Sequence, residues 1–361
     1  MSKRGDDAVV DISDVEVIAP NFKRRLSGVT STIIQLVPVQ RALGYKVAAL
    51  GPGLPSSTPH IRFRDLLHGW KAPRGKRVRV WHARRNIEML PAIFLRDVLR
   101  MKLKIAFTSA SQRKHTGWTK WLISKMDAVI ATSSRTSGYL TVPNTVILHG
   151  IDTERFVPSA NKAEAKRVCA LPANKKIVGC FGRVRHQKGT DLFVDAMIDV
   201  LPARPDWIAI VAGRATGPHV DYEKGLIDRI AKAGLADRIL FVGEHTNIND
   251  WYRALDLFIA PQRWEGFGLT PLEAMATAVP VIATDVGAFP ELIVTGNEET
   301  GAIVPRDDMK AMATTAAQFM DDGIRRDAAS ARALQHARAS FSITNEVEAL
   351  GQVYDALLNS R

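Results

Sequence analysis

Short runs of β-branched and other apolar residues alternate with longer helical patterns along this chain of 361 residues. The runs form two series, at 15–19, 46–50, 78–81, 105–108, 128–131 and 145–148, and at 176–181, 207–212, 239–242, 257–260, 279–283 and 302–304. Runs that are apolar at nearly every position are typical of strands in parallel sheets with helices on both faces. The pattern therefore predicts an α/β protein with two doubly wound domains facing across a deep crevice.

The boundary between the two domains is expected at a polar stretch, 158–167. Helices are predicted between strands of the first series, at 29–43, 91–101 and 116–125. The last predicted helix, 345–358, is amphipathic, with apolar residues along one side: Val347, Leu350, Val353, Tyr354 and Leu357. We therefore divide the chain into domains at 1–157 and 158–344, followed by this helix within 345–361.

Several protein classes are excluded by simple features of the sequence. The longest stretch without Asp, Glu, Lys or Arg is 136–151, whereas a membrane-spanning helix needs about 20 mostly apolar residues. The N-terminus has no apolar run like that of a signal peptide. Two cysteines, Cys169 and Cys180, are too few for a disulfide framework or a Cys-rich zinc site. We expect a protein of a reducing compartment, the cytoplasm.

Positive charge is concentrated in the first part of the chain. Residues 1–160 contain 26 Lys and Arg against 11 Asp and Glu, a net charge of +15. Residues 161–361 contain 23 against 26, a net charge of −3. This asymmetry favours a polyanionic partner for the first domain, such as nucleic acid, a phosphorylated substrate or an anionic membrane surface. The alternative is a basic surface that only keeps the protein soluble.

The first candidate site is the loop that directly follows the predicted strand at 176–181. It contains Gly182, Arg183, Lys188 and Gly189. Loops at the carboxyl ends of strands line the ligand crevice of an open α/β sheet. Glycines allow the backbone to approach a ligand closely, and Arg and Lys together suit a diphosphate. The loop therefore indicates a diphosphate site, and the alternative is a solvated basic turn.

The second candidate site is the segment between the strand at 257–260 and a predicted helix. Its loop residues are Glu265, Gly266, Phe267, Gly268 and Leu269. The two glycines leave backbone N–H groups free near the positive end of the helix, where an anion binds well. We therefore assign this loop to the same ligand as the first one.

Two carboxylates, Glu265 and Glu273, flank this second loop. A diphosphate would repel them, so we expect them to face neutral hydroxyls, from which they would accept charge-assisted hydrogen bonds. Two diols joined by a diphosphate describe a nucleotide sugar, with Glu265 binding the hexose and Glu273 the ribose. The alternatives are a surface acid in a loop for Glu265 and a favourable charge in the first turns of a helix for Glu273.

With these motifs, the second half of the chain resembles the retaining glycosyltransferases of family 4, which have the GT-B fold. The resemblance rests on two glutamates separated by seven residues, on the loop from Gly182-Arg183 to Lys188-Gly189, and on 251–258 and 284–292. It implies two Rossmann-like domains and a last helix that crosses back onto the first domain. It also implies a binding site for the base near Gly243 and Glu244.

The resemblance further implies how the reaction proceeds. Retention is thought to occur by front-face attack, in which the leaving phosphate takes the acceptor proton and no protein nucleophile is needed. Arg183 and Lys188 would neutralise the leaving diphosphate. No Asp-x-Asp pair lies on a crevice loop to hold Mg²⁺, so we expect no metal and no cofactor besides the donor co-substrate.

Two positions in the first domain gain a role from the resemblance. The family usually has a glycine pair where this chain has Ser27-Gly28, so only Gly28 is assigned to the donor phosphate, while Ser27 is predicted to cap the following helix. His82 aligns with the histidine that contacts the hexose and is assigned a catalytic role. The alternative for His82 is a histidine of the core.

Basic residues of the first domain are candidates for binding an acidic acceptor. They are Lys23, Arg24, Arg84, Arg85, Arg113 and Lys114. Further lysines lie near Trp118, Trp121 and an apolar helix around 93–99, a mixture that suits an anionic bilayer surface. The apolar residues are equally consistent with a core, and solvated charge is the alternative for the basic ones.

Details of this half resemble the lipopolysaccharide-core mannosyltransferases of α-proteobacteria, particularly 21–33, 112–133 and 148–152. Most family members have Asn where this chain has His149. These enzymes move mannose from GDP-mannose to the inner Kdo sugar of a lipid A precursor. Kdo carries a carboxylate and lipid A carries phosphates, which a basic domain would attract. The resemblance implies a cytoplasmic enzyme, peripheral on the inner face of the inner membrane.

Three other functions remain open at this point. A related transferase would use a UDP-hexose donor and another lipid or polysaccharide acceptor. A polyanion-binding protein without chemistry would explain the basic half, but Glu265 and Glu273 oppose it because they repel phosphate, and no nucleic-acid-binding module is recognised. A nucleotide-sugar epimerase would use the same two-domain scaffold.

Overall fold

A computed structural model describes residues 8–24 and 28–360. The chain divides into two compact units, unit 1 with residues 1–149 and 343–361, and unit 2 with residues 150–342. The polar stretch that the sequence analysis used as a boundary lies inside unit 2. It contains α5 (Lys162–Val168), which packs against α8 (Ile248–Arg253). Lys166 Nζ lies 2.9 Å from Asp256 Oδ2, which attaches this stretch to unit 2.

Unit 1 contains a parallel sheet. Within the described residues its strands are β1 (Val17–Pro20), β2 (Val47–Leu50), β3 (His60–Ile61), β4 (Arg79–Ala83), β5 (Leu103–Ser109), β6 (Ala128–Ala131) and β7 (Thr145–Val146). They lie in the order β3-β2-β1-β4-β5-β6-β7, and neighbouring strands are parallel. The two-residue strand β3 is too short to give a sequence signal, and β7 is shorter than predicted.

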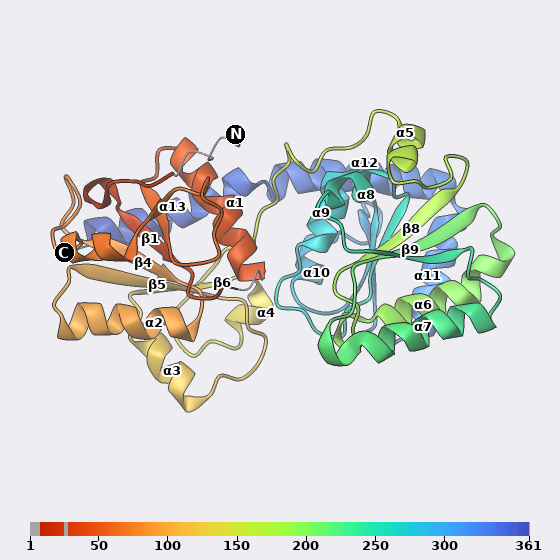
Figure 1. Ribbon diagram of the computed structural model, residues 1–361. Helices are drawn as coiled ribbons and strands as arrows, with labels where there is room; N and C mark the ends of the chain where they lie inside the picture. Colours follow the sequence, from red (N-terminus) through yellow and green to blue (C-terminus); the bar gives the residue numbers. More distant parts are fainter. Residues whose placement is uncertain (1–7, 25–27, 361) are drawn as a thin grey trace, which may run out of the picture. The chain divides into compact units, whose positions relative to one another are not determined.

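Helices cover both faces of this sheet (Figure 1). One face carries α1 (Gly28–Ala42) and α13 (Ile343–Asn359); the other carries α2 (Asn86–Ile93) with its π-helical continuation (Phe94–Val98) and α3 (Gly117–Ser124). The short α4 (Ser134–Ser137) follows β6. Alternate residues of each strand enter opposite cores, so Val17 and Ala19 pack with α1 and α13 while Ile18 packs on the other side.

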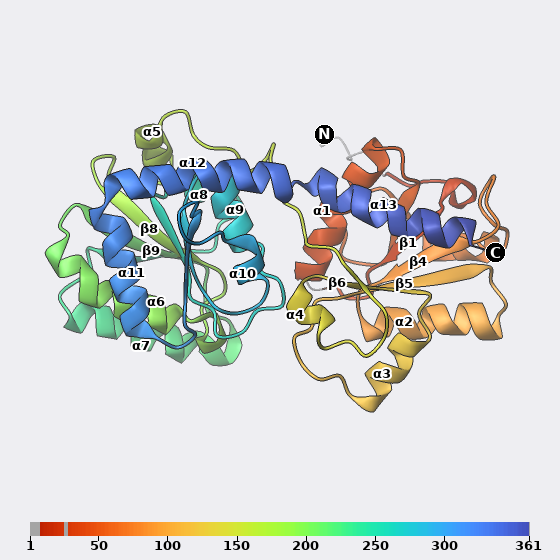
Figure 2. The ribbon, with the colours of Figure 1, turned by 180° about the vertical axis from the view of Figure 1, so that it is seen from behind.

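The last helix belongs to unit 1, as the family resemblance implied. Tyr354 of α13 is buried, and its hydroxyl lies 2.7 Å from His82 Nδ1 and 3.4 Å from Gln40 Nε2. Glu346 of α13 lies 2.7 Å from His149 Nδ1. Figure 2 shows α13 running beside α1 over the sheet. These polar contacts fasten the helix within an otherwise apolar core.

Unit 2 contains a second parallel sheet, whose described strands are β8 (Lys176–Phe181), β9 (Trp207–Ala212), β10 (Ile239–Gly243), β11 (Leu257–Ala260), β12 (Val281–Thr284) and β13 (Gly301–Val304). Their order is β10-β9-β8-β11-β12-β13. This is the strand order of a Rossmann fold, in which the chain reverses direction across the sheet between its first and fourth strands. The switch point of unit 2 therefore lies between β8 and β11.

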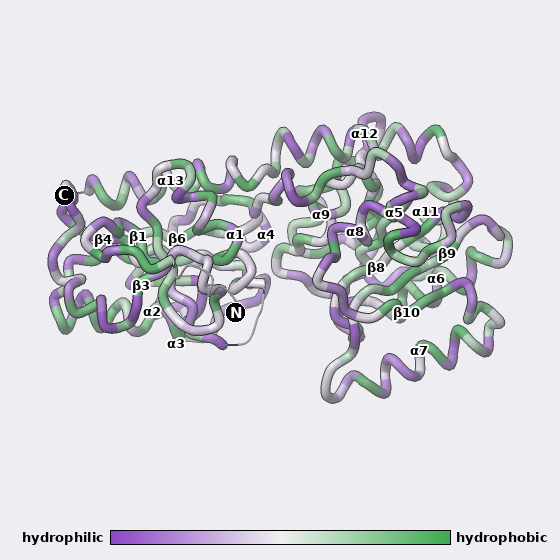
Figure 3. The backbone as a smooth tube through the Cα atoms, turned by 45° about the horizontal axis from the view of Figure 1, so that its top comes forward, coloured by the Kyte–Doolittle hydropathy of each residue, from purple (hydrophilic) through white to green (hydrophobic). Residues whose placement is uncertain are grey.

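Helices again form a layer on each side of the sheet. One layer contains α6 (Thr190–Val200), α7 (Val220–Lys232) and α11 (Met309–Asp321), and the other contains α8, α9 (Thr270–Ala276) and α12 (Gly323–Ser340). The four-residue α10 (Phe289–Leu292) follows β12. In Figure 3 the strands are mostly hydrophobic, whereas α7 alternates between hydrophilic and hydrophobic residues. The buried strands account for the continuous apolar runs in the sequence, and the amphipathic outer helices account for the helical patterns between them.

One predicted helix was wrong in its bounds. The sequence analysis placed it at 91–101, whereas α2 begins at Asn86 and a π-helical turn ends the segment at Val98. The early start follows from Glu88, whose buried carboxylate accepts from the backbone N–H of Arg84 at 2.8 Å. A carboxylate in the first turn satisfies N–H groups that have no partner inside the helix.

Candidate active site

The loops after β8 and β11 meet at the switch point of unit 2. Lys188 Nζ forms an ion pair with Glu265 Oε2, and the two side chains are only 20% and 16% exposed. Gly189 has a φ of +70°, and a Cβ at this position would lie 1.8 Å from the carbonyl oxygen of Pro261. Because only glycine fits this approach, the end of the Lys188 loop lies directly against the segment that leads to Glu265.

Three neighbouring strands of unit 2 lead into glycines with positive φ: Gly182 after β8, Gly213 after β9 and Gly243 at the end of β10. The N–H of Gly213 donates to the carbonyl of Gly243 at 2.6 Å. A Cβ on Gly213 would lie 1.9 Å from the carbonyl oxygen of Gly182. At Gly182 and Gly243 an added Cβ would meet no described atom within 4 Å. This edge of the sheet therefore exposes main chain that a ligand can approach closely.

The β8 loop carries two arginines besides Lys188. Arg183 is exposed and forms no hydrogen bond or ion pair with any described residue. The Nε of Arg185 is buried, and it too has no hydrogen-bond partner in the described part of the chain. Burial lowers the pKa of Arg185, the charge of Arg183 lowers it further, and Glu265 opposes both effects. Three cations thus lie near a single carboxylate, which leaves the loop with an excess of positive charge.

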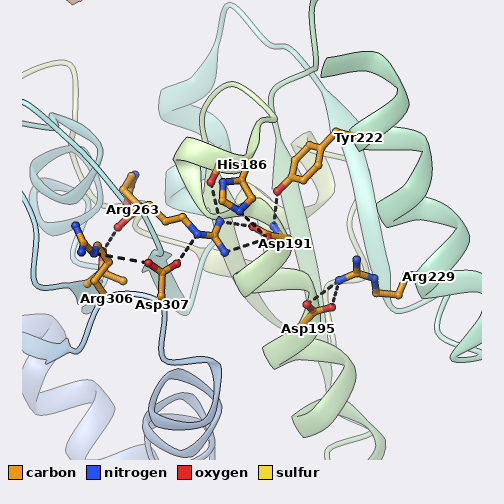
Figure 4. A network of polar contacts seen from close by, with 10 residues as sticks. His186, Asp191, Asp195, Tyr222, Arg229, Arg263, Arg306 and Asp307 are labelled. Carbon is orange, nitrogen blue, oxygen red and sulfur yellow. Dashed lines mark hydrogen bonds and ion pairs between the residues drawn. The ribbon is translucent and has the colours of Figure 1, made fainter. Parts of the chain in front are cut away.

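A network of polar contacts holds the β8 loop, the segment that follows β8, in position (Figure 4). Arg263, two residues before Glu265, donates to both carboxylate oxygens of Asp191 at 2.6 and 3.0 Å and forms an ion pair with Asp307. It also donates to the carbonyl of His186 at 2.7 Å, while its backbone N–H donates to Gln187 at 3.0 Å. Arg263 therefore fixes the turn that presents Lys188.

The carboxyl group of Asp191 is the centre of this network. Although burial favours its neutral form, hydrogen bonds from Arg263 and Tyr222 lower the pKa of Asp191. Tyr222 reaches Asp191 from α7, and the pKa of Tyr222 is raised by burial and by the same carboxylate. An ionised Asp191 is a stronger hydrogen-bond acceptor than a neutral one, so this network is most stable when the carboxyl group is charged.

The loop after β11 is compact. Glu265 Oε1 accepts from the N–H of Gly266 at 3.1 Å. Gly268 has a φ of +85°, and a Cβ there would lie 2.5 Å from the ring of Phe289 and 2.8 Å from Cγ of Glu265. Phe267 is buried, so its side chain supports the loop. Leu269 is half-buried at the start of α9.

Glu273 lies in the first turn of α9. Its Oε2 accepts a hydrogen bond of 2.7 Å from the hydroxyl of Tyr252, a residue of α8. Burial raises the pKa of Glu273, whereas the hydrogen bond from Tyr252 and the charge of Arg155 oppose this rise. Glu273 is thus a half-buried carboxyl group held by a specific donor. A surface acid that only favours the N-terminus of a helix would need no such donor.

One of the two carboxylates lies beside a cation that the sequence analysis assigned to the diphosphate. Glu265 contacts Lys188 itself. A carboxylate and a diphosphate repel each other, but an ammonium between them attracts both. Lys188 can therefore lie between Glu265 and an arriving phosphate.

In unit 1, the structure places His82 in the core rather than on the surface. The residue is 1% exposed. Its Nε2 lies 2.7 Å from the hydroxyl of Thr108 and its Nδ1 2.7 Å from that of Tyr354. Burial lowers the pKa of His82 well below 6.5. Both ring nitrogens have internal partners, so His82 supports α13 in this structure, and its contact with a sugar stays a prediction.

Arg85 also has an internal role. Its Nη1 lies 2.8 Å from both Glu88 Oε1 and Asn21 Oδ1, and its Nη2 lies 3.1 Å from the hydroxyl of Thr30. The Arg85 side chain is 12% exposed, and that of Glu88 is fully buried. The charge of Arg85 is therefore neutralised inside unit 1, which corrects its assignment to an acceptor. Arg84 is half-buried and donates to the carbonyl of His82 at 3.3 Å.

The other basic candidates of unit 1 are exposed. Lys23 and Arg24 follow β1, and Arg113 and Lys114 follow β5. Because β1, β4 and β5 are neighbours in a parallel sheet, these loops and Arg84 share the carboxyl edge of that sheet. Gly28 is the first residue of α1 at the same edge. Ser27, the predicted cap of this helix, lies outside the described residues.

Comparison with known proteins gives the family. Residues 161–336 match the model of glycosyl transferases group 1. The chain is 72% identical over 350 residues to the lipopolysaccharide core biosynthesis mannosyltransferase LpsB of Rhizobium meliloti, covering 97% of this chain and 100% of LpsB. It is 54% identical to the mannosyltransferase LpcC of Rhizobium leguminosarum bv. viciae, covering 96% and 98%. The chain belongs to the group 1 glycosyltransferases.

A solved structure with low sequence identity supports the fold of this glycosyltransferase. HepE of Anabaena, crystallised with UDP, superimposes with a TM-score of 0.82 at 18% identity, covering 95% of this chain and all of HepE. With its two Rossmann-like units, the chain therefore has the GT-B fold that the sequence resemblance implied.

Further residues of the glycosyltransferase lie in or beside the candidate site, and the sequence analysis did not assign them. They are Arg185, Asp191, Gly213, Arg214, Tyr252 and Arg263. Arg214 forms an ion pair of 3.1 Å with Glu244, the predicted residue after β10, and both side chains are largely exposed. Gly213 had a detectable signal, since it follows a buried strand as Gly182 does. Tyr252 lies in 251–258, a segment on which the family resemblance rested, but its contact with Glu273 left no signal. Arg263 had no signal, because it acts on residues distant in the sequence.

Among the described residues of this glycosyltransferase, no three His, Cys, Asp or Glu side chains converge in a way that would hold a metal ion. No described helix is both long and apolar enough to cross a bilayer.

Proposed function

We propose that this glycosyltransferase transfers mannose from GDP-mannose to the inner-core Kdo sugar of a lipid A precursor, with retention of the anomeric configuration. The observation that carries the proposal is the juxtaposition of the Lys188 loop and the Glu265 loop at the switch point of unit 2. Dinucleotide and nucleotide ligands bind at this point in doubly wound sheets. Two relatives named as lipopolysaccharide core mannosyltransferases support the choice of sugar and pathway.

The donor is proposed to bind along the carboxyl edge of the unit 2 sheet. Arg183 and Lys188 pair with the diphosphate, and the backbone at Gly182 and Gly266 approaches it closely. Glu265 accepts from the hexose and Glu273 from the ribose. The base lies near Gly243 and Glu244, where the exposed main chain offers donors and acceptors.

The chemistry is proposed to need neither a protein nucleophile nor a metal. The bond between the anomeric carbon and the diphosphate oxygen breaks, and the acceptor hydroxyl attacks the same face of the sugar. Its proton passes to the leaving phosphate oxygen. Arg183 and Lys188 stabilise the negative charge that develops on the diphosphate, a form of electrostatic catalysis that needs no reorganisation when the donor is already paired.

The acceptor is proposed to bind to unit 1 through positive charge. Lys23, Arg24, Arg84, Arg113 and Lys114 lie at the carboxyl edge of its sheet. The Kdo carboxylate and the lipid A phosphates are anions, and exposed cations raise their local concentration and association rate. Arg85 is left out of the acceptor site, because its charge is already paired with Glu88.

An apolar ridge on unit 1 supports a peripheral position on the inner membrane. The ridge consists of Ile87, Leu90, Phe94, Val98, Trp118 and Trp121, which are between 43% and 61% exposed. The two tryptophans stack with their ring centres 5.1 Å apart, and Lys125 lies over one of them. Aromatic and aliphatic side chains next to lysines suit the interface of an anionic bilayer, where each basic residue contributes about 1 kcal/mol.

Donor choice can be tested by titration calorimetry with GDP-mannose, UDP-glucose and UDP-galactose. GDP-mannose is expected to bind most tightly to the wild-type protein and more weakly to Lys188→Ala. Preference for a UDP-sugar would support the alternative transferase instead. If no nucleotide sugar binds while RNA binds tightly and in a salt-sensitive manner, the protein is a polyanion-binding protein. An epimerase is tested by incubating the donor alone and looking for its epimer.

Membrane binding can be tested by flotation with vesicles that contain anionic lipid. We expect binding to fall with rising salt and in Trp118→Ser/Trp121→Ser. Leu67→Ser is the matched control, because Leu67 is an exposed apolar residue of unit 1 outside the ridge. Binding that is indifferent to salt, to anionic lipid and to the tryptophans would contradict the proposal.

A further inference from the structure

Tyr252 is enclosed by aromatic rings and points its single polar group at a site residue. Within unit 2 its side chain is fully buried, with ring centres of Phe181, Phe258 and Phe156 at 4.7, 5.5 and 6.0 Å. Its hydroxyl donates to Glu273 Oε2 at 2.7 Å. The surrounding rings leave the hydroxyl little freedom, because buried side chains occupy well-defined rotamers.

The carboxylate of Glu273 receives no other hydrogen bond from the described residues, while its backbone carbonyl accepts from the hydroxyl of Thr277 at 3.1 Å. A carboxylate has about four acceptor positions on its two oxygens. Tyr252 occupies one of them on Oε2, which orients the carboxyl plane and leaves Oε1 available. A ligand that donates two hydrogen bonds can therefore use the remaining positions.

We propose that Tyr252 is a positioning residue, whose hydroxyl orients the Glu273 carboxylate so that its free oxygen accepts from the ribose diol of the nucleotide sugar. The inference rests on the proposed function, since it requires that Glu273 binds the donor. Tyr252 itself touches no reacting atom. It acts by reducing the freedom that Glu273 would otherwise lose when the donor binds.

The same hydrogen bond favours the charged form of the acceptor. Burial raises the pKa of Glu273, and the groups that oppose this rise are Tyr252 and Arg155. Tyr252 remains protonated because burial, Glu273 and Cys180 all raise its own pKa. Removing the hydroxyl takes away one of the two groups that stabilise the charged form, so the pKa of Glu273 should rise.

The alternative is a purely structural bond, in which a buried phenol simply uses the nearest acceptor. A double-mutant cycle separates the two cases, because a residue that acts only through Glu273 has no effect on donor binding once Glu273 is changed. Tyr252→Phe keeps the ring and its packing. Glu273→Gln keeps the shape of the side chain without its charge.

The experiment measures GDP and GDP-mannose binding by calorimetry from pH 5 to pH 8, for the wild type, Tyr252→Phe, Glu273→Gln and the double variant. Tyr354→Phe is the matched control, since Tyr354 is an equally buried tyrosine of unit 1 that hydrogen-bonds His82. Circular dichroism and melting curves confirm that each variant is folded. We expect Tyr252→Phe to weaken binding about tenfold at neutral pH.

The pH profile and the cycle give the decisive outcomes. In Tyr252→Phe, binding should be lost at a higher pH than in the wild type, whereas Tyr354→Phe should follow the wild type. In the Glu273→Gln background the Tyr252 substitution should have no further effect. Unchanged binding by a folded Tyr252→Phe, or an equal loss in both backgrounds, would overturn the inference while the proposed function stands. A wild type that binds neither GDP nor GDP-mannose would overturn the proposed donor and the inference with it.

Discussion

Lys188 and Glu265, which lie 77 positions apart in the sequence, form an ion pair at the switch point of unit 2. The pair holds the Lys188 ammonium where a diphosphate is proposed to bind. Glu265 neutralises this partly buried ammonium when no diphosphate is present. On the proposed function, an arriving diphosphate would share the ammonium with Glu265 or draw it away, and Glu265 oxygens would become free for the sugar. Binding of the two ends of the proposed donor would then be linked.

Substituting the cations of the β8 loop should slow transfer. Lys188→Ala and Arg183→Ala each remove a charge-assisted contact to the diphosphate, so kcat/KM for the donor should fall about tenfold to a hundredfold. Steady-state rates measure this. Lys175→Ala is a suitable control, because that lysine donates to the carbonyl of Pro205 on an exposed part of unit 2. Near-wild-type rates in both variants would argue against the diphosphate site.

Removing Lys188 should also destabilise the protein, because it leaves the Glu265 carboxylate without its counter-ion. Since the pair is partly exposed, we expect a loss of about 1 kcal/mol in the free energy of unfolding. Adding Glu265→Gln should restore much of the stability but not the activity. Denaturant unfolding of the single and double variants tests this, and full additivity would show that the pair is not coupled.

The polar network around Arg263 should affect activity by holding the Lys188 loop in position. Arg263→Met removes contacts with Asp191, Asp307 and the His186 carbonyl, so the Lys188 loop should lose its fixed position, with kcat/KM reduced about tenfold. Arg229→Met is the control, because the Arg229–Asp195 pair in Figure 4 is more exposed and should matter little. Equal effects of the two substitutions would mean that Arg263 has no special role.

The stability of the protein should depend on pH through His82. Burial lowers the folded-state pKa of His82 below 6.5. The unfolded chain then binds a proton that the folded one does not, so stability is fully present above about pH 6.5 and is lost as the pH falls, by up to about 1.4 kcal/mol per pH unit. His82→Gln should flatten this slope between pH 6.5 and 5, whereas His68→Gln, an exposed control, should not. The two slopes are obtained from denaturant unfolding at each pH, and identical slopes would contradict the assignment.

Transfer is expected to survive metal removal. If Arg183 and Lys188 supply the positive charge for the leaving diphosphate, extensive treatment with EDTA should leave the rate unchanged within error. The rate is measured before and after adding back Mg²⁺ or Mn²⁺. Full loss of transfer in EDTA, with recovery when metal is added, would contradict the metal-independent mechanism.

Much of the fold could be predicted from the sequence, because strands buried on both faces are apolar at every position. The strand bounds of unit 2 nearly match the predicted ones, and 176–181, 207–212 and 257–260 are identical. Strand β3 could not be predicted, since two residues give no period. Unit 2 begins at Gly150 rather than at the predicted residue 158. Within 150–157, Phe156 packs against Tyr252, a contact that composition does not show.

The contacts within the candidate site could not be predicted from the sequence. Residue type and loop position singled out Lys188 and Glu265, but not their contact. His82 was assigned to the hexose by the family resemblance, which does not show that its ring is buried. Successive side chains of a strand point to opposite faces, and His82 shares the face of Val80, which α13 covers. Which helix covers a face depends on contacts between segments distant in the chain, such as His82 and Tyr354, and these leave no local signal.

The most direct measurement is a transfer assay with labelled GDP-mannose and a Kdo-bearing lipid A precursor, followed by chromatographic separation of the lipid product. The account predicts that label moves to the lipid with the wild-type protein, that the anomeric configuration is retained, and that Lys188→Ala loses most of the rate. A folded wild-type protein that releases no label to this lipid, but transfers a hexose from a UDP-sugar, would contradict it.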